Sequence, residues 1–396
     1  MPYDFDRIID RTNTYSQKWD RAGEVFGSGD IIPLWVADMD FASPPPLLDA
    51  LSRRIDHGVM GYTFAPSSYY QSLMDWLARR HSWGVEREWI TLCPSVVFAV
   101  HLAVRLFSRP GDQIVVQPPV YPPLFKAIQR NGREVLYNPL KLGGDRYGMD
   151  LSSLAGQVGP RTRMLILCSP HNPVGRVWER GELLELGQFC LDRNITILSD
   201  EIHSDLLYRG HRHVPIASLS VPLAGQTITL NAPTKTFNMA GLGGAYAVIR
   251  NEKMREVLSA EMERLGIHPA NLFSLISAEA AYSLCGDWLD ELLMYLQDNL
   301  DFLTGFIEQR IPSVRMFRPE GTSLVWLDFR ELGMQDRQLA KFLVEEAGIG
   351  LNPGTAFGPG GEGFQRLNLG CPRSTLRKAL EQLEAALEKL QSRPER

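Results

Sequence analysis

The stretch MLILCSPHNPVGRVWERGELLELGQFCLDRNITILSD, residues 164–200, decides the fold. It begins and ends with short runs, Met164–Cys168 and Ile195–Ser199, that are apolar on both faces, as buried parallel strands are. Between them, Arg180–Asp192 has an amphipathic pattern whose apolar stripe consists of Leu183, Leu184, Leu186, Phe189, Cys190 and Leu191. That stripe is typical of a helix packed on a sheet. A strand, a helix and a second strand in this order predict an α/β fold.

The same alternation continues on both sides of this stretch. Further runs of the buried-strand kind are QIVVQ at 113–117, EVLY at 134–137, TITL at 227–230 and AYAVI at 245–249. We therefore expect a mostly parallel sheet with helices on its faces, within a large domain of residues 50–285.

The C-terminal part of the chain has a different pattern. Long helical periodicities at 288–309, 336–347 and 374–390 surround short strand-like pieces at 314–317, 323–327 and 365–369. This mixture predicts a smaller α+β domain, which we expect to consist of residues 1–49 and 286–396. The glycine-rich segment Gly354–Gly363 is typical of a mobile loop.

Composition excludes several classes of protein. The 396 residues are 44% hydrophobic and 22% charged, which excludes disordered and fibrous chains. There are 41 Lys and Arg against 46 Asp and Glu, a net charge of -5, so we expect no nucleic-acid partner. No apolar window approaches the roughly 18 to 20 residues that cross a bilayer, and the N-terminal segment is acidic where a secretory signal would be basic. We expect a soluble, cytoplasmic protein without membrane contact.

Polar residues directly follow four of the predicted strands. In an open α/β sheet, ligands bind beyond the carboxyl ends of the strands. There the sequence places an aromatic ring, an amide, a carboxylate with a nearby imidazole, and an amine: Tyr121, Asn172, Asp200 with His203, and Lys235. A carboxylate that directly follows an apolar strand has to be paired or it destabilises the fold. Together these groups predict a functional site at one edge of the sheet.

A metal site is an alternative for one of these segments. Hard and borderline metals accept the ligand types found close together there, namely Asp200, Glu201, His203, Asp205, His211 and His213. The segment lacks HExxH or a comparable fixed spacing, and the five cysteines are too widely spaced for paired thiolate ligands or a disulfide framework. We therefore favour a site without metal.

A resemblance to a known family rests on eight ordered motifs: DRTNTYSQKWD, PLWVADMDF, HGVMGYT, PPVYPP, PHNPVGRVW, SDEIHSDL, NAPTKTFNMAGL and RLNLGCPRS. With them the chain resembles the fold-type I pyridoxal 5'-phosphate (PLP) enzymes of the aspartate aminotransferase superfamily. Within that superfamily it is similar to the MalY/PatB group of cystathionine β-lyases, to which WVADMDF and SDEIHSDL are specific. The resemblance implies a seven-stranded, mostly parallel sheet in the large domain, flanked by helices.

The resemblance also implies roles for the residues at the strand ends. Lys235 matches the lysine to which PLP is covalently attached, and which later moves the substrate Cα proton. Asp200 matches the carboxylate that faces the ring nitrogen of PLP and keeps it protonated. Asn172 matches the amide near the phenolic oxygen, and Tyr121 matches the ring stacked on the cofactor. His203 stands where many aminotransferases carry Tyr.

The cofactor phosphate needs hydrogen-bond donors and a helix end. Ser95, Val96 and Val97 open an apolar helical stretch, and the backbone N–H groups there would hold a dianion. Thr234 could add a hydroxyl. Tyr62 resembles a tyrosine that reaches the phosphate from a neighbouring subunit, so the resemblance implies a homodimer. The chain departs from the family at Ser95, where members usually have glycine.

The amino-acid substrate has its own set of residues. Arg366 matches the arginine that forks onto the substrate α-carboxylate, a pairing that Lys could not reproduce. Ala37 would lie near the same carboxylate through its backbone, and the resemblance places Asn172 and Tyr121 beside the substrate as well.

The activity that the resemblance implies is β-elimination on L-cystathionine or a related cysteine S-conjugate, in methionine biosynthesis. The products would be a thiol, pyruvate and ammonia. An aminotransferase is one alternative, because every residue named above also serves transamination. A regulatory protein that keeps PLP but works through a partner is another.

Overall fold

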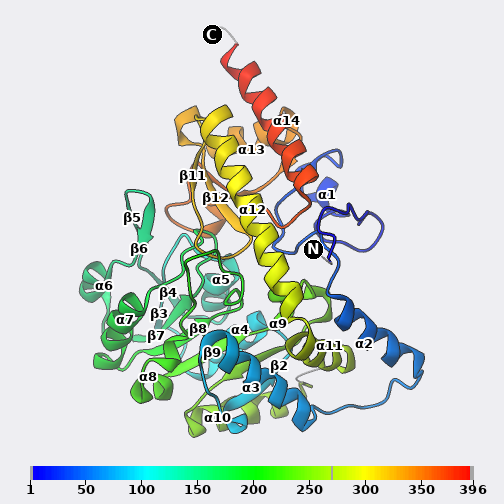
Figure 1. The fold of residues 1–396 in the computed structure, drawn as a ribbon. Coiled ribbons are helices and arrows are strands. Elements are labelled where there is room, and N and C mark those ends of the chain that lie inside the picture. Colours follow the sequence, from blue (N-terminus) through cyan, green and yellow to red (C-terminus); the bar gives the residue numbers. More distant parts are fainter. Residues whose placement is uncertain (1–2, 269–270, 393–396) are drawn as a thin grey trace.

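The structure is a computed structural model that describes residues 3–268 and 271–392. Its largest element is a seven-stranded sheet (Figure 1) with the order β2-β10-β9-β8-β7-β3-β4. In that order the strands are Ile90–Cys93, Ala245–Val248, Thr227–Asn231, Thr196–Asp200, Thr162–Cys168, Gln113–Val116 and Glu134–Tyr137. All neighbours from β9 to β4 pair in parallel. The predicted α/β fold with a mostly parallel seven-stranded sheet is confirmed.

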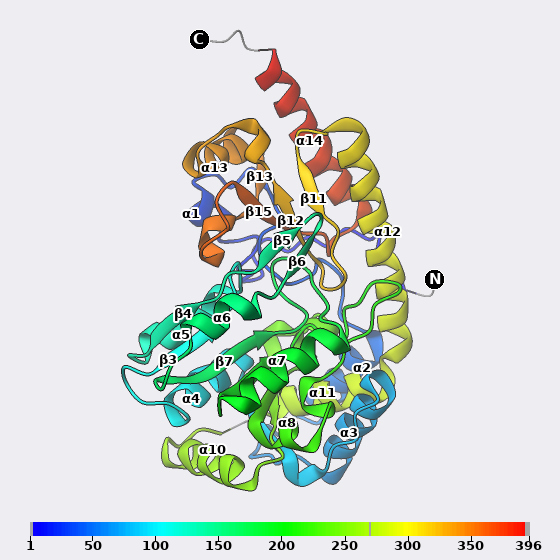
Figure 2. The same cartoon turned by 90° about the vertical axis from the view of Figure 1, so that its left-hand side faces the viewer.

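Helices cover both faces of this sheet (Figure 2). One face carries α4, α5 and α10, at Val96–Leu106, Pro122–Arg130 and Glu252–Arg264. The other carries α6, α7 and α8, at Leu151–Gln157, Arg180–Asp192 and Val221–Gln226. On β3, Ile114 and Val116 pack toward the first group and Val115 toward the second. Because side chains alternate between two buried faces, the strands are continuously apolar in sequence.

Two of the expected strands differ from buried parallel ones. β10 is antiparallel to both of its neighbours. The connection from β9 to β10 contains only α9 (Pro233–Thr236) and a short 3-10 turn, too little for the crossover that a parallel strand requires. β4 lies at the edge of the sheet and is half-exposed, because it has one neighbour only. The apolar sequences of β10 and β4 do not indicate that β10 is antiparallel or that β4 lies at the edge of the sheet.

A second, smaller sheet carries the C-terminal strands. It is antiparallel, with the order β11-β12-β15-β14, and these strands are Arg315–Phe317, Leu324–Asp328, Phe364–Asn368 and Asn352–Pro353. In a separate two-stranded sheet, β1 (Ile32–Pro33) of the N-terminal segment pairs in parallel with β13 (Ile349–Gly350) of the C-terminal part. The boundaries expected near residues 49 and 286 stay a prediction, and residues 1–2 and 393–396 of the smaller unit lie outside the described residues.

Long helices connect the two sheets. Figure 1 shows α12 running from the region of α11 up to the smaller sheet, where α13 and α14 also lie. The α-helices not yet named are α1 (Ala22–Phe26), α2 (Pro45–Asp56), α3 (Ser67–His81), α11 (Leu272–Leu284), α12 (Gly286–Arg310), α13 (Asp336–Glu345) and α14 (Arg373–Gln391). A hairpin is formed by β5 (Lys141–Gly143) and β6 (Arg146–Gly148). None of the helices in the described residues is long and apolar enough to span a membrane.

The glycine-rich segment Gly354–Gly363 contacts the protein at defined points, and its mobility stays a prediction. It begins with a 3-10 turn, Gly354–Phe357, and the Phe357 ring is buried against Trp326. The carbonyl of Gly361 lies so close to Gly354 that no side chain fits there. The glycines at 354 and 361 therefore permit close backbone contact, and the Phe357 side chain fixes this end of the segment to the core.

Candidate active site

The four groups predicted at the strand ends lie at one edge of the large sheet. Asp200 is the last residue of β8, Asn172 follows β7, Tyr121 directly precedes α5, and Lys235 lies in α9 after β9. Asp200 and Asn172 are buried. The groups are close enough to influence one another, since the Asp200 carboxylate contributes to raising the pKa of Tyr121, after the larger effect of burial. The structure thus brings these four residues together.

Lys235 is the amine of this cluster. Its Nζ donates a hydrogen bond of 2.8 Å to the backbone oxygen of Ala37. Burial lowers the pKa of the Lys235 ammonium to about 8, although the Asp38 carboxylate acts in the opposite direction. An amine with a pKa near neutrality can both release and accept a proton at physiological pH.

Asp200 is the carboxylate of the cluster. Burial raises the pKa of Asp200 to about 7. Within the described chain, the one hydrogen bond to its side chain comes from the Ile202 N–H, at 3.3 Å. A buried carboxylate with so little support remains ionised only next to a positive charge. The site can therefore receive a cationic group at this carboxylate.

Arg366 reaches the same edge from β15 of the smaller sheet. Its Nη1 donates to Asn172 Oδ1 at 3.0 Å and its Nη2 donates to the Trp35 oxygen at 2.7 Å. Nε has no hydrogen-bond partner, and no carboxylate among the described residues pairs with this guanidinium. Burial lowers the pKa of Arg366 to about 10. A buried guanidinium without an acidic partner is suited to bind a carboxylate ligand.

His203 and Thr234 complete the inner wall of the site. Burial, followed by repulsion from Lys235 and Arg366, lowers the pKa of His203 to about 3, so the imidazole is neutral. In the part of the chain that the structure describes, its Nδ1 has no hydrogen-bond partner. Thr234 is buried directly beside Lys235 in the chain.

The remaining predicted residues lie at a helix end and in an exposed segment. α4 begins at Val96, and Ser95 caps it by accepting the Phe98 N–H at 3.2 Å. The N–H groups of Val96 and Val97 belong to the first turn, whose donors have no partner within a helix. Tyr62 is fully exposed, in the segment that joins α2 to α3 at the lower right of Figure 1. It is not part of the site within this chain.

Comparison with known proteins assigns the chain to a family. A family model described as aminotransferase class I and II matches residues 30–383. The chain belongs to the class I and II aminotransferase family. It is 44% identical to cystathionine beta-lyase PatB of Bacillus subtilis, over 97% of this chain and 99% of PatB, and 34% identical to protein MalY of Escherichia coli, over 96% and 97%. Cystalysin from Treponema denticola, whose crystal structure contains PLP, superposes with a TM-score of 0.96 at 36% identity and covers 98% of this chain and 100% of its own.

The potential metal ligands of this aminotransferase-family chain are divided between separate contacts. Glu201 pairs with His213 at 2.9 Å, and Asp205 pairs with His81 at 2.9 Å. His211 is exposed. No group of three or more His, Cys, Asp or Glu side chains that could hold a metal occurs in residues 3–268 and 271–392.

Three residues that the sequence did not single out position the segment Trp35–Phe41 against the lysine. Asn238 donates to the backbone oxygens of Met39 and Phe41 at 2.9 and 2.7 Å. Asn368 donates to those of Val36 and Asp38 at 2.8 and 2.7 Å. Asp38 itself faces Lys235 and pairs with Arg11 at 2.5 Å. All three residues lie within the family motifs given in the sequence analysis, and those motifs are the signal that could have identified them.

Proposed function

We propose that this chain is a PLP-dependent carbon–sulfur β-lyase. It converts L-cystathionine or a related cysteine S-conjugate, with water, to a thiol, pyruvate and ammonia, and the thiol from cystathionine is homocysteine. The observation that carries the proposal is the 44% identity to a cystathionine β-lyase over nearly the full length of both chains. The cofactor is PLP, as in cystalysin.

The residues present fit this cofactor. Lys235 offers an amine of lowered pKa to the aldehyde. Asp200 is a buried carboxylate that forms no ion pair with the described residues, and a protonated pyridine nitrogen would supply the facing positive charge. Thr234 and the first N–H groups of α4, at Val96 and Val97, suit a phosphate dianion. Asn172 and Tyr121 lie between these groups and the substrate arginine.

The chain's own residues divide the reaction between them. When bound, PLP supplies an electron sink for the electron pair left at the substrate Cα. Lys235 removes the proton from Cα, which permits loss of the thiolate from Cβ. Asp200 holds the proton on the ring nitrogen. Arg366 binds the α-carboxylate, and its orientation is fixed because Asn172 and the Trp35 oxygen already accept two of its N–H groups.

The second candidate is an aminotransferase, favoured by the description of the family model that matches residues 30–383. The residues that bind the cofactor and the α-carboxylate serve both reactions, and only the fate of the electron pair at Cα differs. A lyase expels a β-substituent, whereas an aminotransferase returns a proton to the cofactor side and releases a 2-oxo acid.

One substrate panel separates these functions. The purified, PLP-loaded protein is incubated with L-cystathionine and S-methyl-L-cysteine, and pyruvate and free thiol are quantified. A parallel reaction holds an amino acid without a β leaving group plus 2-oxoglutarate. We expect equimolar pyruvate and thiol, with glutamate formation at least a hundredfold slower. Glutamate formation as the main reaction would contradict the lyase, and a PLP-loaded protein without any turnover would indicate a regulatory role.

We also infer a homodimer in which Tyr62 contributes to the neighbouring active site. The support is an exposed apolar segment between α2 and α3, in which the side chains of Tyr62 and Phe64 are 106% and 80% exposed. Light scattering should give twice the chain mass, and Tyr62→Ala should weaken retention of PLP. A role in methionine biosynthesis follows if cystathionine is the preferred substrate, and the cytoplasmic location stays a prediction.

A further inference from the structure

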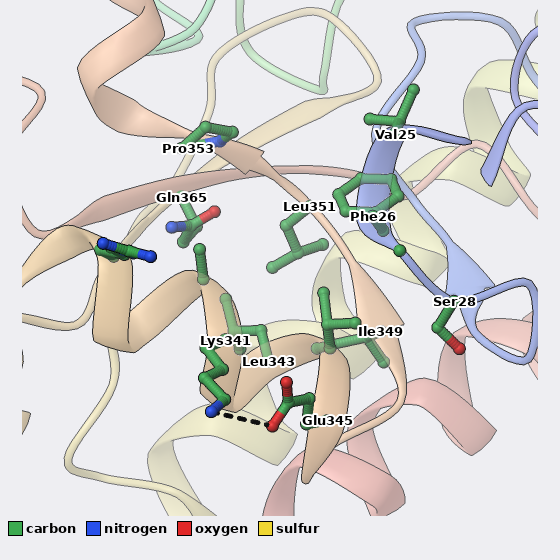
Figure 3. A pocket seen from close by; sticks show the side chains of 14 residues that line it. Val25, Phe26, Ser28, Lys341, Leu343, Glu345, Ile349, Leu351, Pro353 and Gln365 are labelled. Carbon is green, nitrogen blue, oxygen red and sulfur yellow. Dashed lines mark ion pairs between the residues drawn. The ribbon is translucent and has the colours of Figure 1, made fainter. Parts of the chain in front are cut away.

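A cavity separate from the active site lies in the smaller half of the molecule, between α13, β13 and the end of α1 (Figure 3). Its volume is about 540 Å³, within the range of roughly 300 to 1,000 Å³ that is typical of small-molecule sites. Most of its wall is apolar and consists of Phe26, Leu343, Val344, Ile349, Leu351 and Pro353. Such a wall accommodates an aromatic or branched aliphatic group.

One polar side chain interrupts this apolar wall. Gln365 lines the cavity among the apolar residues in Figure 3, and only 1% of it is exposed. Its Nε2 has no hydrogen-bond partner among the described residues. Buried amide N–H groups nearly always have an acceptor in native proteins, so an unpaired one requires an explanation. The Nε2 atom presents almost no accessible surface to the cavity, so it can donate to a ligand oxygen there once the amide turns toward the ligand.

Charge among the lining residues favours an anionic ligand. Lys341 Nζ lies 3.5 Å from Glu345 Oε2, so these two charges compensate each other. Arg337 also lines the cavity, and none of the described residues forms an ion pair with it. The lining therefore carries one uncompensated positive charge.

We propose that this cavity binds a small monocarboxylic acid with an aromatic or branched aliphatic body. The carboxylate accepts the Gln365 N–H and is attracted by Arg337, while the body packs against Phe26 and Val344. A neutral or cationic ligand of the same shape would leave the Arg337 charge uncompensated, and a dianion would exceed it.

The cavity lies behind the arginine of the active site. Gln365 and Arg366 are consecutive on β15, so their side chains point to opposite faces of the smaller sheet. Phe26 packs edge-to-face on Trp35 with ring centroids 5.6 Å apart, and the Trp35 oxygen accepts Arg366 Nη2. A ligand against Phe26 restrains this chain of contacts and so preorganises Arg366. Ligand binding in the cavity is expected to lower the KM for the cysteine conjugate without changing kcat. This coupling to the active site rests on the proposed function, whereas the binding site itself does not.

Calorimetric titration of the PLP-loaded protein with 3-phenylpropionate tests the site. We expect saturable binding to the wild type and to Ala385→Trp, a matched change on the exposed side of α14. Binding should be lost in Ala340→Trp, which fills the cavity from α13. Arg337→Gln, at an exposed position that does not affect folding, should weaken it about threefold to tenfold. 3-Phenylpropanamide should bind at least tenfold more weakly than the acid.

Two further measurements exclude the active site as the place of binding. Arg366→Gln removes the active-site carboxylate anchor and should retain 3-phenylpropionate binding within about threefold. In turnover assays the probe should lower the KM for the cysteine conjugate in the wild type but not in Ala340→Trp. Absence of binding to the wild type, or binding lost in Arg366→Gln and kept in Ala340→Trp, would overturn the site. Site binding with a KM that rises or stays constant would overturn the coupling, and the calorimetric result stands even if the lyase activity fails.

Discussion

The two halves of the active site are built from different kinds of structure. Asp200 ends β8, where backbone pairing with β7 and β9 fixes its position, and Asn172 lies in the turn that follows β7. The segment Trp35–Phe41, which accepts hydrogen bonds from Lys235 and Arg366, has no regular secondary structure. Its backbone is held by the side-chain amides of Asn238 and Asn368.

This difference separates the chemistry from substrate binding. Groups that act on the reacting bonds need rigid placement, and a sheet with both faces buried provides it. Recognition of the substrate carboxylate depends on Arg366 and on a segment held by individual hydrogen bonds. Substitutions in the sheet half should therefore lower kcat, whereas substitutions around the segment should raise KM.

The largest effect is expected from Asp200→Asn. The amide cannot supply the negative charge that keeps the ring nitrogen protonated, so kcat for pyruvate release should fall by about 10² to 10³, with KM nearly unchanged. The matched control is Thr229→Val on β9, which removes a buried hydroxyl without a hydrogen-bond partner and should leave both constants alone. A normal kcat in the asparagine variant would show that the sheet half does not control the chemistry.

Arg366→Lys should change KM rather than kcat. Lysine keeps the charge but loses the forked geometry and at least one charge-assisted hydrogen bond, worth about 1.5 to 3 kcal/mol. The KM for the cysteine conjugate should rise roughly 10- to 100-fold, while kcat changes much less. Steady-state kinetics over a range of substrate concentrations measures both. A fall in kcat with an unchanged KM would remove the distinction between the halves.

Asn368→Ala tests whether side-chain amides hold the segment. Asn368 is completely buried and loses two donated bonds, to the Val36 and Asp38 oxygens, on substitution. The free energy of unfolding in urea should fall by about 2 kcal/mol, as expected for buried acceptors left unpaired. Thr229→Val again serves as the control. Equal stability of Asn368→Ala and the wild type would mean that other contacts hold the segment.

The last prediction concerns pH and the cofactor-free protein. Burial raises the pKa of Asp200 to about 7 from an ordinary value of 3.8. Between these values the folded state binds more protons than the unfolded state, so this group's stabilising contribution is present below pH 3.8 and is lost as the pH rises through 7. Asp200→Asn lacks this loss, so its stability relative to the wild type should increase with pH in urea unfolding. A constant difference would contradict the raised pKa.

The sheet half was largely predictable from the sequence. Short apolar runs bounded by turns mark buried strands, and the rule that ligands bind at their carboxyl ends places Asn172, Asp200 and Lys235 together. The resemblance to a PLP-enzyme family added Arg366, which lies on a different sheet and which no local pattern connects to Asp200. Its position beside Asn172 is a long-range contact.

The position of the segment Trp35–Phe41 could not be predicted from local sequence patterns. Trp35–Phe41 has neither helical nor strand periodicity, and its partners Asn238 and Asn368 are distant in sequence. Asparagines of this kind are typical of turns, so nothing in the residue type indicated that they bind a remote backbone. For a similar reason the glycines of Gly354–Gly363 suggested mobility, although they permit close packing. The antiparallel direction of β10 also depends on pairing, which apolar content does not encode.

The central claim is that Lys235 carries the cofactor at the edge of the large sheet, beside Asp200. Reduction of the PLP-loaded protein with borohydride, followed by digestion and mass spectrometry of the peptides, tests it directly. The account predicts that the added cofactor mass lies on Lys235 alone and is absent from Lys235→Ala, which should also lose the visible absorbance of the bound cofactor and its turnover. Cofactor mass on another lysine, or a Lys235→Ala variant with full activity, would contradict it.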